Sequence, residues 1–225
     1  MFRRSRPIEP VALFISLDKQ PSWDRRYLSL IQSLTERVDV EEVNKARHAI
    51  DYLDRHNPAV VIVTDEGILR YETPHPYLSE KLVDYTRGGG KVIIGTRFSV
   101  ASQLSEVIDR WFHVFWHVPW KCAEAEPGST YLNMESQRKY LATSHLPVSI
   151  HLQSMYLKHV PHSDRLYCRA IELDDGPSVF CHDNTTCQQT PLAITNVGRG
   201  LFAYVGDVDH RGDVESIILA ICELD

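Results

Sequence analysis

The chain has 225 residues, of which 43% are hydrophobic and 24% are charged, and its formal net charge is −6. This composition is typical of a globular α/β protein and differs from that of a disordered chain. The mildly acidic balance gives no bulk attraction for nucleic acid or for anionic membranes, and no apolar run approaches the roughly 18 residues of a membrane span.

Residues 1–10 begin the chain with a basic stretch, which we expect to be a short solvated tail, with a targeting segment as the alternative. The apolar run after it is short and has no small-residue cleavage site, so it does not resemble a signal peptide. The five cysteines are odd in number and form no C-x-x-C motif, which favours reduced thiols in a cytoplasmic protein over a disulfide framework. A bridge between Cys181 and Cys187 is the alternative.

Residues 11–116 alternate short apolar runs with amphipathic segments. Asn57-Pro58 and Gly88-Gly89-Gly90 mark the ends of two helical segments, because proline disfavours helix before it and glycine takes the left-handed cap easily. The pattern predicts strands at 11–17, 38–43, 59–64 and 91–94, and helices at 23–37, 46–56, 77–87 and 99–116. Alternating strands and helices predict βαβ units, and therefore a mostly parallel sheet with helices on both faces.

The second half of the chain is less regular at first. We expect residues 117–164 to form an irregular insertion around a short helix at 135–141, and this insertion is a candidate lid over the strand ends. Strands follow at 165–173, 178–182, 192–197 and 201–205, the last two as a closing antiparallel hairpin, and a helix at 213–222 ends the chain. With no linker or repeat in the sequence, we expect residues 11–225 to form a single α/β domain.

Ligands of open parallel sheets bind beyond the carboxyl ends of the strands, so the residues that follow the predicted strands are candidates for a site. The candidate acid–base groups are Asp18, Glu66, Asp207 and His210. The candidate substrate-binding groups are Asp65, Thr96, Arg97 and Ser99.

The turn after the fourth predicted strand has a particular combination of charges. It joins a buried strand to a predicted helix, so free backbone N–H groups, the helix dipole and the charge of Arg97 coincide there. That combination suits a carboxylate or a phosphate. The alternative is an internal ion pair between Arg97 and Asp18, Asp65 or Glu66, with Ser99 serving only as a cap.

Other side chains give weaker signals. His113 and His117 lie four residues apart, as in some metal sites, but the pattern offers no third ligand, so we expect no metal and no cofactor. Trp111, Trp116 and Trp120 are expected in the core, with a ligand-stacking wall or a dimer face as the alternative. The sequence has no Gly-x-Gly-x-x-Gly, Walker or Gly-x-Ser-x-Gly motif, which removes the main support for a dinucleotide enzyme, a P-loop NTPase or an ordinary serine hydrolase.

Two stretches of the sequence resemble a known superfamily. Residues 85–95 (YTRGGGKVIIG) resemble the helix, glycine turn and strand before the nucleophile elbow of the class I glutamine amidotransferase-like superfamily. Residues 190–207 (TPLAITNVGRGLFAYVGD) are similar to the closing hairpin of its trehalose-utilisation-like (ThuA-like) branch. The resemblance covers most of residues 11–116 and 188–222 and implies a flavodoxin-like fold.

The resembling enzymes need groups that this sequence lacks. An amidotransferase of this superfamily uses a cysteine on a strained turn, where the thiol pKa is lowered, and a histidine base. Arg97 best matches the cysteine position, with Thr96 as the next choice, and the histidine position falls at or near Asp207, with His210 displaced by a few residues. We therefore expect neither glutamine amidotransferase nor cysteine peptidase activity.

Three hypotheses about function follow. The first is a non-amidotransferase member of the superfamily that binds a small polar or anionic molecule at the strand ends. The second is a hydrolase, isomerase or lyase that acts on a sugar or a carboxylated metabolite by Asp/Glu/His acid–base chemistry. The third is a degenerate fold that acts as the scaffold of a homodimer through the aromatic segment 111–120. No nucleic acid or membrane partner is expected.

Overall fold

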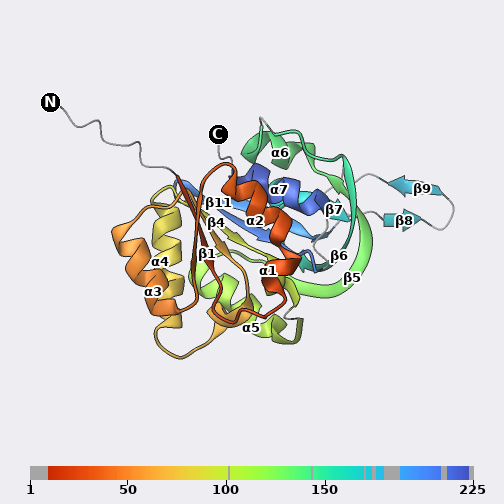
Figure 1. Ribbon diagram of the computed structural model, residues 1–225. Coiled ribbons are helices and arrows are strands. Elements are labelled where there is room, and N and C mark those ends of the chain that lie inside the picture. Colours follow the sequence, from red (N-terminus) through yellow and green to blue (C-terminus); the bar gives the residue numbers. More distant parts are fainter. Residues whose placement is uncertain are drawn as a thin grey trace.

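The apolar runs of the sequence form the strands of one large sheet. The computed structural model describes residues 10–100, 102–142, 144–169, 171–173, 176–179, 188–208 and 212–222. The strands of the large sheet are β1 (Val11–Ile15), β2 (Asp39–Val43), β3 (Val60–Val63), β4 (Lys91–Ile94), β5 (Lys121–Leu132), β6 (Ser149–Lys158), β7 (Arg165–Arg169), β10 (Gln189–Thr190), β11 (Leu192–Val197) and β12 (Gly200–Val205). They lie in the order β10-β6-β5-β7-β11-β12-β4-β3-β1-β2 (Figure 1). A separate two-stranded sheet pairs β8 (Ile171–Leu173) with β9 (Gly176–Val179).

Helices and short turns connect most of the strands. The α-helices are α1 (Trp23–Arg26), α2 (Leu28–Thr35), α3 (Ala46–Arg55), α4 (His75–Arg87), α5 (Ser105–Trp111), α6 (Met134–Tyr140) and α7 (Gly212–Cys222). The 3-10 turns are η1 (Glu66–Leu69), η2 (Thr96–Val100), η3 (Ser102–Leu104) and η5 (His162–Asp164), and η4 (Phe112–Trp116) is a π-helical turn. The helix predicted at 23–37 is thus divided at Tyr27 into α1 and α2.

The strands β2, β1, β3, β4 and β12 are neighbours and run parallel. The first strand, β1, lies between β2 and β3, and the strand order β2-β1-β3-β4-β12 is that of flavodoxin-like sheets. It brings the carboxyl ends of β1, β3, β4 and β12 to one edge, and most of the predicted site residues follow these strands. We call this region the strand-end edge.

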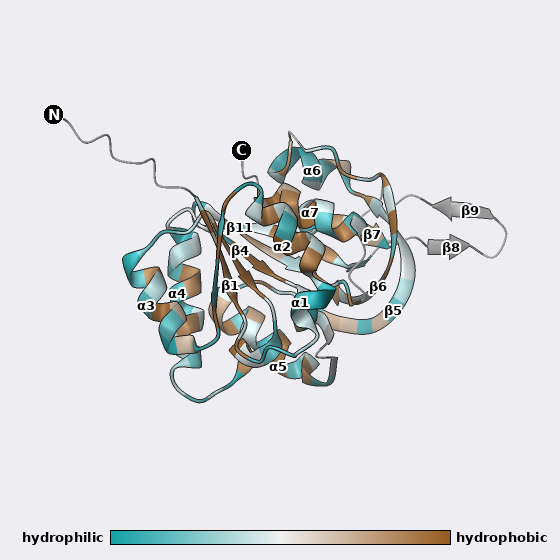
Figure 2. Cartoon of the chain, in the orientation of Figure 1, coloured by the Kyte–Doolittle hydropathy of each residue, from teal (hydrophilic) through white to brown (hydrophobic). Residues whose placement is uncertain are grey.

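Helices cover both faces of the sheet, as predicted (Figure 1). Successive residues of a strand point to opposite faces, so Leu13 and Ile15 of β1 share a core with α3, α4 and α5. Ala12 and Phe14 share a second core with α1, α2 and α7 on the other face. Burial on both faces explains why the central strands are apolar throughout, and Figure 2 shows them as brown runs between helices of mixed colour.

The prediction of a mostly parallel sheet is wrong. Of the nine neighbouring pairs in the large sheet as the structure describes it, four are parallel and five, from β10 through β6, β5, β7 and β11 to β12, are antiparallel. The antiparallel half comes largely from residues 117–164, which contain two long strands where we predicted irregular chain. The closing antiparallel hairpin is confirmed, with β11 and β12 paired along their full lengths.

β5 was not predicted because its sequence is neither apolar throughout nor regularly alternating between apolar and polar residues. Most of its residues are exposed or half-buried, and Pro127-Gly128 interrupts it as a turn would. Both residues lie opposite β6 at positions where no pairing with β7 is described, the kind of edge position at which proline is tolerated. Gly128 also permits close packing, since a Cβ there would stand 2.7 Å from the Tyr156 hydroxyl.

The single helix predicted at 99–116 is divided into turns of different pitch. Two 3-10 turns, η2 and η3, precede α5, and the π-helical η4 ends at His117, which adopts a left-handed conformation with φ of 54°. Phe112 and Trp116 of η4 both pack against Phe202 of β12, with the Trp116 ring stacked at 3.7 Å between centroids. The change of pitch therefore lets bulky rings from one short segment share a single patch of the sheet.

Candidate functional site

The strand-end edge brings together five of the predicted site residues. Asp65 and Glu66 follow β3, Thr96 and Arg97 follow β4, and Asp207 follows β12. Because these strands are parallel, their carboxyl ends coincide at the place where open sheets bind ligands.

Thr96 holds the turn after β4 in a strained conformation. Its φ is 57°, in the left-handed region that β-branched residues rarely adopt. The side chain is buried, its hydroxyl donates to the Thr64 carbonyl oxygen at 2.7 Å, and it also hydrogen-bonds to Tyr27. The strained position of this turn is therefore Thr96, one residue before Arg97.

Arg97 lies beside Glu66 but is incompletely paired with it. One contact joins them, from Nη2 to Oε1 at 3.4 Å, which is long for a charge-assisted hydrogen bond. Nε of Arg97 and Oε2 of Glu66 are buried and have no hydrogen-bond partner in the part of the chain that the structure describes. The arginine side chain stays 32% exposed. The internal ion pair considered as the alternative thus exists, and it leaves guanidinium donors unused.

Asp65 is an almost fully buried carboxyl group, with 1% of its surface exposed. Its Oδ1 accepts a hydrogen bond from the Gly67 N–H at 2.9 Å and so caps η1. Burial raises the pKa of the Asp65 carboxyl, and the Glu66 charge adds to the rise, against hydrogen bonds from the backbone N–H groups of Asp18 and Gly67. A raised pKa suits a proton donor or acceptor, but in this conformation the group is closed off from solvent.

Ser99 links two backbone segments of the strand-end edge. Its hydroxyl lies 2.9 Å from the Thr96 carbonyl oxygen and 2.8 Å from the Asp207 carbonyl oxygen, so it ties the turn after β4 to the end of β12. The residue is fully buried. Ser99 therefore holds neighbouring backbone in place and does not present its hydroxyl to solvent.

Tyr27 and Ser154 also belong to this region, and neither was predicted as a site residue. Burial, followed by the negative charge of Asp207, raises the pKa of Tyr27 to about 12, so its hydroxyl is a neutral group near pH 7. Ser154 of β6 is buried and forms an isolated β-bridge with Asp207. Tyr27 lies within the helix predicted at 23–37, and Ser154 lies in the segment without a predicted strand, so no sequence signal linked them to the site.

Two of the predicted residues do not join this group. The Asp18 carboxylate pairs instead with Arg70, at 3.3 Å between Oδ2 and Nη2, and both side chains are 47% exposed. Asp18 contributes to the site through its backbone N–H, which hydrogen-bonds to Asp65. His210 lies outside the described residues, and its role stays a prediction.

Metal and thiol chemistry find no support in the described residues. They contain no group of three His, Cys, Asp or Glu side chains arranged to hold a metal ion, and His113 and His117 are both exposed. Cys122, Cys168 and Cys222 are buried. The other pair, Cys181 and Cys187, lies outside the described residues, so the bridge between them stays untested.

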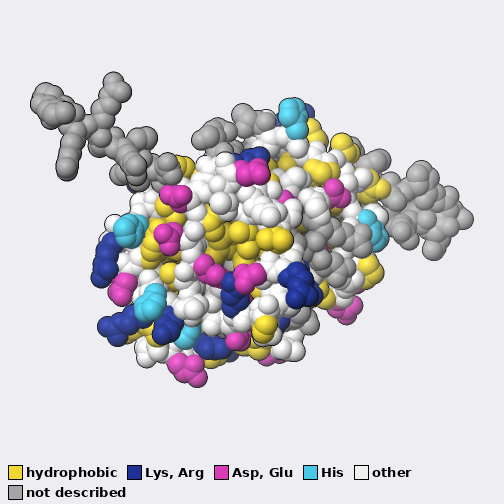
Figure 3. All heavy atoms as spheres, in the orientation of Figure 1, with side chains coloured by type: hydrophobic (Ala, Val, Ile, Leu, Met, Phe, Trp, Pro, Cys, Tyr) yellow, Lys and Arg dark blue, Asp and Glu magenta, His cyan; other side chains and the backbone are white. Residues whose placement is uncertain are grey.

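The surface carries mixed charge. Acidic and basic side chains are interspersed on the face that Figure 3 shows, without a continuous field of either sign. Within the described residues, no helix combines the length and apolarity needed to cross a membrane.

Comparison with known proteins identifies the fold. No family model matches the sequence, and no curated protein matches it. Among solved structures, a ThuA-like protein from Bacteroides uniformis is similar over 98% of this chain and 94% of its own, with a TM-score of 0.58 and 11% identity. At this identity the likeness establishes a shared α/β fold and carries no activity across.

Two β-galactosidases give weaker structural matches. The enzyme from Halorubrum lacusprofundi is similar over 97% of this chain and 30% of its own, with a TM-score of 0.47 and 15% identity. The enzyme from Bacillus circulans sp. alkalophilus is similar over 96% and 31%, with a TM-score of 0.48 and 12% identity. This chain thus spans about a third of the length of these enzymes.

Proposed function

We propose that this chain binds a small anionic molecule at the strand-end edge, with Arg97 as its main contact. The observation that carries the proposal is the incomplete pairing of Arg97 with Glu66. An arginine that a carboxylate satisfies fully forms two parallel N–H···O bonds, whereas Arg97 forms one contact at 3.4 Å. A carboxylate or phosphate group of a ligand would supply hydrogen-bond acceptors for the guanidinium donors that Glu66 does not engage.

Glu66 narrows the class of ligand. Its side chain is 20% exposed, and it accepts hydrogen bonds that hydroxyl groups of a ligand can donate. Asp65 and Asp207 are buried, so they add negative charge nearby without offering open contacts. One arginine beside one accessible carboxylate therefore fits a hydroxylated acid or a sugar phosphate better than a simple dianion.

The proposal excludes amidotransferase chemistry. Thr96 stands at the strained position, and a threonine hydroxyl lacks the nucleophilicity of a thiolate. That hydroxyl is also buried and already donates to the Thr64 carbonyl oxygen. The turn after β4 is thus strained as a nucleophile elbow is, but the Thr96 hydroxyl at its strained position is already hydrogen-bonded within the protein.

A thermal-shift screen tests the proposal on the wild-type chain, Arg97→Ala and Glu66→Gln. The probes are citrate, gluconate, glucose 6-phosphate, a nucleotide and, as the neutral member, glucose. A ligand at about a hundred times its dissociation constant adds roughly 2.7 kcal/mol of stability. We expect a shift with one of the anions that Arg97→Ala abolishes and that Glu66→Gln retains or increases, because the glutamine no longer competes for the guanidinium.

Arg87→Ala is the matched control, because Arg87 is also an arginine in a loose contact with a carboxylate, at 3.7 Å from Asp84, but lies on an exposed helix surface. The Arg87→Ala substitution should leave every ligand-induced thermal shift unchanged. Absence of any anion-dependent shift, with Arg97→Ala merely less stable, would show that Arg97 serves only as an internal ion pair.

One observation favours an acid–base enzyme as the second candidate. Asp65 combines burial with a raised pKa at the strand ends, as catalytic carboxyls do. In that case Glu66, Asp207 and His210 are further proton-transfer candidates, on a sugar or carboxylated metabolite. Turnover of a probe that binds at Arg97, and its loss in Asp65→Asn with binding retained, would distinguish this enzyme from a binding module.

The scaffold hypothesis placed the dimer contact on the aromatic segment 111–120. Trp111, Trp116 and Trp120 are 4%, 3% and 1% exposed, so these three rings lie in the core of this chain, as the first of the two sequence interpretations expected. The prediction of a homodimer itself stays untested.

A further inference from the structure

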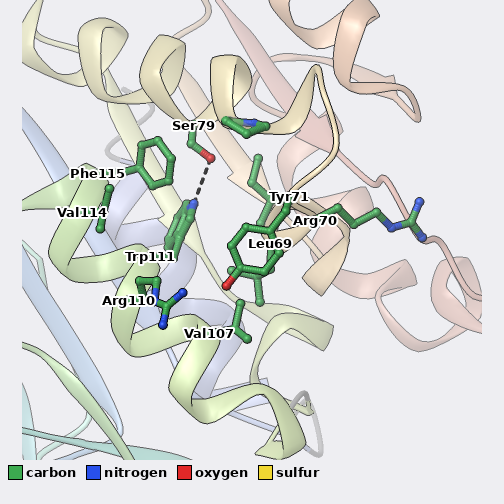
Figure 4. A pocket seen from close by; sticks show the side chains of 11 residues that line it. Leu69, Arg70, Tyr71, Ser79, Val107, Arg110, Trp111, Val114 and Phe115 are labelled. Carbon is green, nitrogen blue, oxygen red and sulfur yellow. Dashed lines mark hydrogen bonds between the residues drawn. The ribbon is translucent and has the colours of Figure 1, made fainter.

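A cavity lies between η1, α4 and α5, and Arg97 is not among the residues that line it. It has a volume of about 230 Å³ and is lined mainly by apolar side chains, among them Leu69, Tyr71, Val107, Trp111 and Phe115 (Figure 4). This volume is below the roughly 300–1,000 Å³ of pockets for drug-sized ligands, so it suits a smaller molecule.

The inner wall of the cavity has no polar group in need of a partner. The Trp111 indole N–H donates to Ser79 Oγ at 2.9 Å, and that hydroxyl lies 3.3 Å from the His75 carbonyl oxygen. An occupant therefore meets the flat Trp111 ring and aliphatic side chains, which favour an apolar and flat body.

Two arginines stand at the cavity, and they differ in their partners. Arg70 pairs with Asp18, and Figure 4 shows its side chain extending away from the other lining residues. Arg110 is exposed, and among the described residues no carboxylate lies within ion-pair distance of its guanidinium. An unpaired cation beside an apolar cavity is complementary to a molecule with one apolar end and one negative charge.

The local backbone also points to a binding role. Val114 and Phe115 reach the cavity from the π-helical turn η4, and single π turns within helices occur frequently at functional sites. Tyr71 is 65% exposed, so its ring lines the cavity without being held in the core.

We propose that this cavity binds a small aromatic monocarboxylate, with its ring against Trp111 and Leu69 and its carboxylate at Arg110. The site is separate from the one proposed at Arg97. It recognises an apolar body and a single charge, whereas the strand-end edge presents polar groups to a hydroxylated anion.

Calorimetric titration of the full chain tests this site with phenylacetate and with its neutral isostere phenylacetamide. We expect phenylacetate to bind roughly three- to tenfold more tightly than the amide, as one partly exposed charge-assisted contact allows. Arg110→Gln should remove that advantage while leaving amide binding unchanged. Val107→Phe, which fills the cavity, should weaken binding of both molecules.

Arg97→Ala and Arg87→Gln are the controls, and both should bind phenylacetate like the wild type. Loss of binding in Arg97→Ala would place the acid at the strand-end edge and overturn the proposal. Equal affinity for acid and amide, or no effect of Arg110→Gln, would also overturn it. Because Val107→Phe can disturb folding, the Trp111 indole N–H resonance of the wild type provides a second measurement, and phenylacetate must shift it in a saturable way.

Discussion

Two buried carboxyl groups in this protein have pKa values shifted in opposite directions. Burial raises the pKa of Asp65. For Asp164, burial acts to raise the pKa as well, but hydrogen bonds from Tyr140, at 2.6 Å, and from Lys139 outweigh it, and the pKa lies below its ordinary value. Proton linkage turns these opposite shifts into opposite dependences of stability on pH.

Asp65→Asn should stabilise the protein increasingly as pH rises. The folded state holds the Asp65 proton more tightly than the unfolded state, whose pKa is about 3.9, so this group favours folding at low pH and loses that contribution as pH rises through the folded pKa. Asparagine keeps an oxygen for the Gly67 N–H and does not titrate. Urea unfolding at several pH values between about 4 and 7 measures the difference between variant and wild type.

Asp164→Asn is the matched comparison, and its sign should be opposite. The stability that Asp164 contributes is present above the unfolded pKa and is lost as pH falls through the depressed folded value, so the variant loses most at neutral pH. A stability difference for Asp65→Asn that does not change with pH would show that burial does not control this group.

At the residue scale, the sequence was sufficient to predict which residues lie at the strand ends but not what each one does there. Asp65, Glu66, Thr96 and Arg97 follow apolar runs that are unmistakable as strands. The strain at Thr96 depends on a backbone angle that no residue pattern encodes, since threonine is unusual at positive φ. The roles of buried Tyr27 and Ser154 depend on contacts across the fold.

At the element scale, the closing hairpin and the end of α4 form one tightly packed junction. Arg199 donates a backbone hydrogen bond to the Arg87 carbonyl oxygen at 3.2 Å, and Leu201 donates one to Gly90 at 3.1 Å. A Cβ at Gly200 would overlap the carbonyl oxygens of Gly90 and Thr86. Gly200 is thus required by its close approach to the backbone of a turn that lies more than a hundred residues earlier in the sequence.

Gly200→Ala should therefore destabilise the protein by roughly 1–3 kcal/mol, the usual range for overpacking. The atoms that the new methyl group meets belong to backbone and cannot rotate away. Urea unfolding measures the loss, with Gly212→Ala as the control, because a Cβ there meets nothing within 4 Å. A Gly200→Ala protein as stable as this control would mean that the junction accommodates the methyl group without loss of stability.

Elements with local signals were predictable, and those defined by distant partners were not. β3 is a continuous apolar run, and α4 ends at three glycines, so both were found. β5 takes its structure from β6, through pairs such as Thr130 with Ile150, and its own pattern shows exposed residues and a Pro-Gly step. The segment 99–116, predicted as one helix, ends in the π-helical η4, where Trp116 stacks on Phe202 of β12, a distant contact that the local pattern does not reveal.

At the scale of the whole molecule, the parallel and antiparallel halves of the sheet share β12, whose carboxyl end belongs to the strand-end edge. The parallel half could be predicted because each βαβ unit is local in sequence and its handedness is fixed. The antiparallel half depends on pairings between distant segments, including the bridge between Ser154 and Asp207. Residues 117–164, a candidate lid in the sequence, therefore reach the predicted site as part of the sheet.

Hydrogen exchange can decide whether that segment moves as a lid. The Met155 N–H donates to the Gly206 carbonyl oxygen at 3.0 Å, the Val208 N–H donates to Gln153 at 2.9 Å, and the Tyr204 hydroxyl donates to Met155 at 2.9 Å. A lid would have to break all three bonds to open, so we expect the Met155 amide to exchange as slowly as that of Ile93 in β4, and only through global unfolding. Exchange measured at increasing urea should then show the same denaturant dependence at both sites. If Met155 instead exchanged quickly, without denaturant dependence, and slowed when an anion bound, residues 117–164 would open independently and the lid would be real.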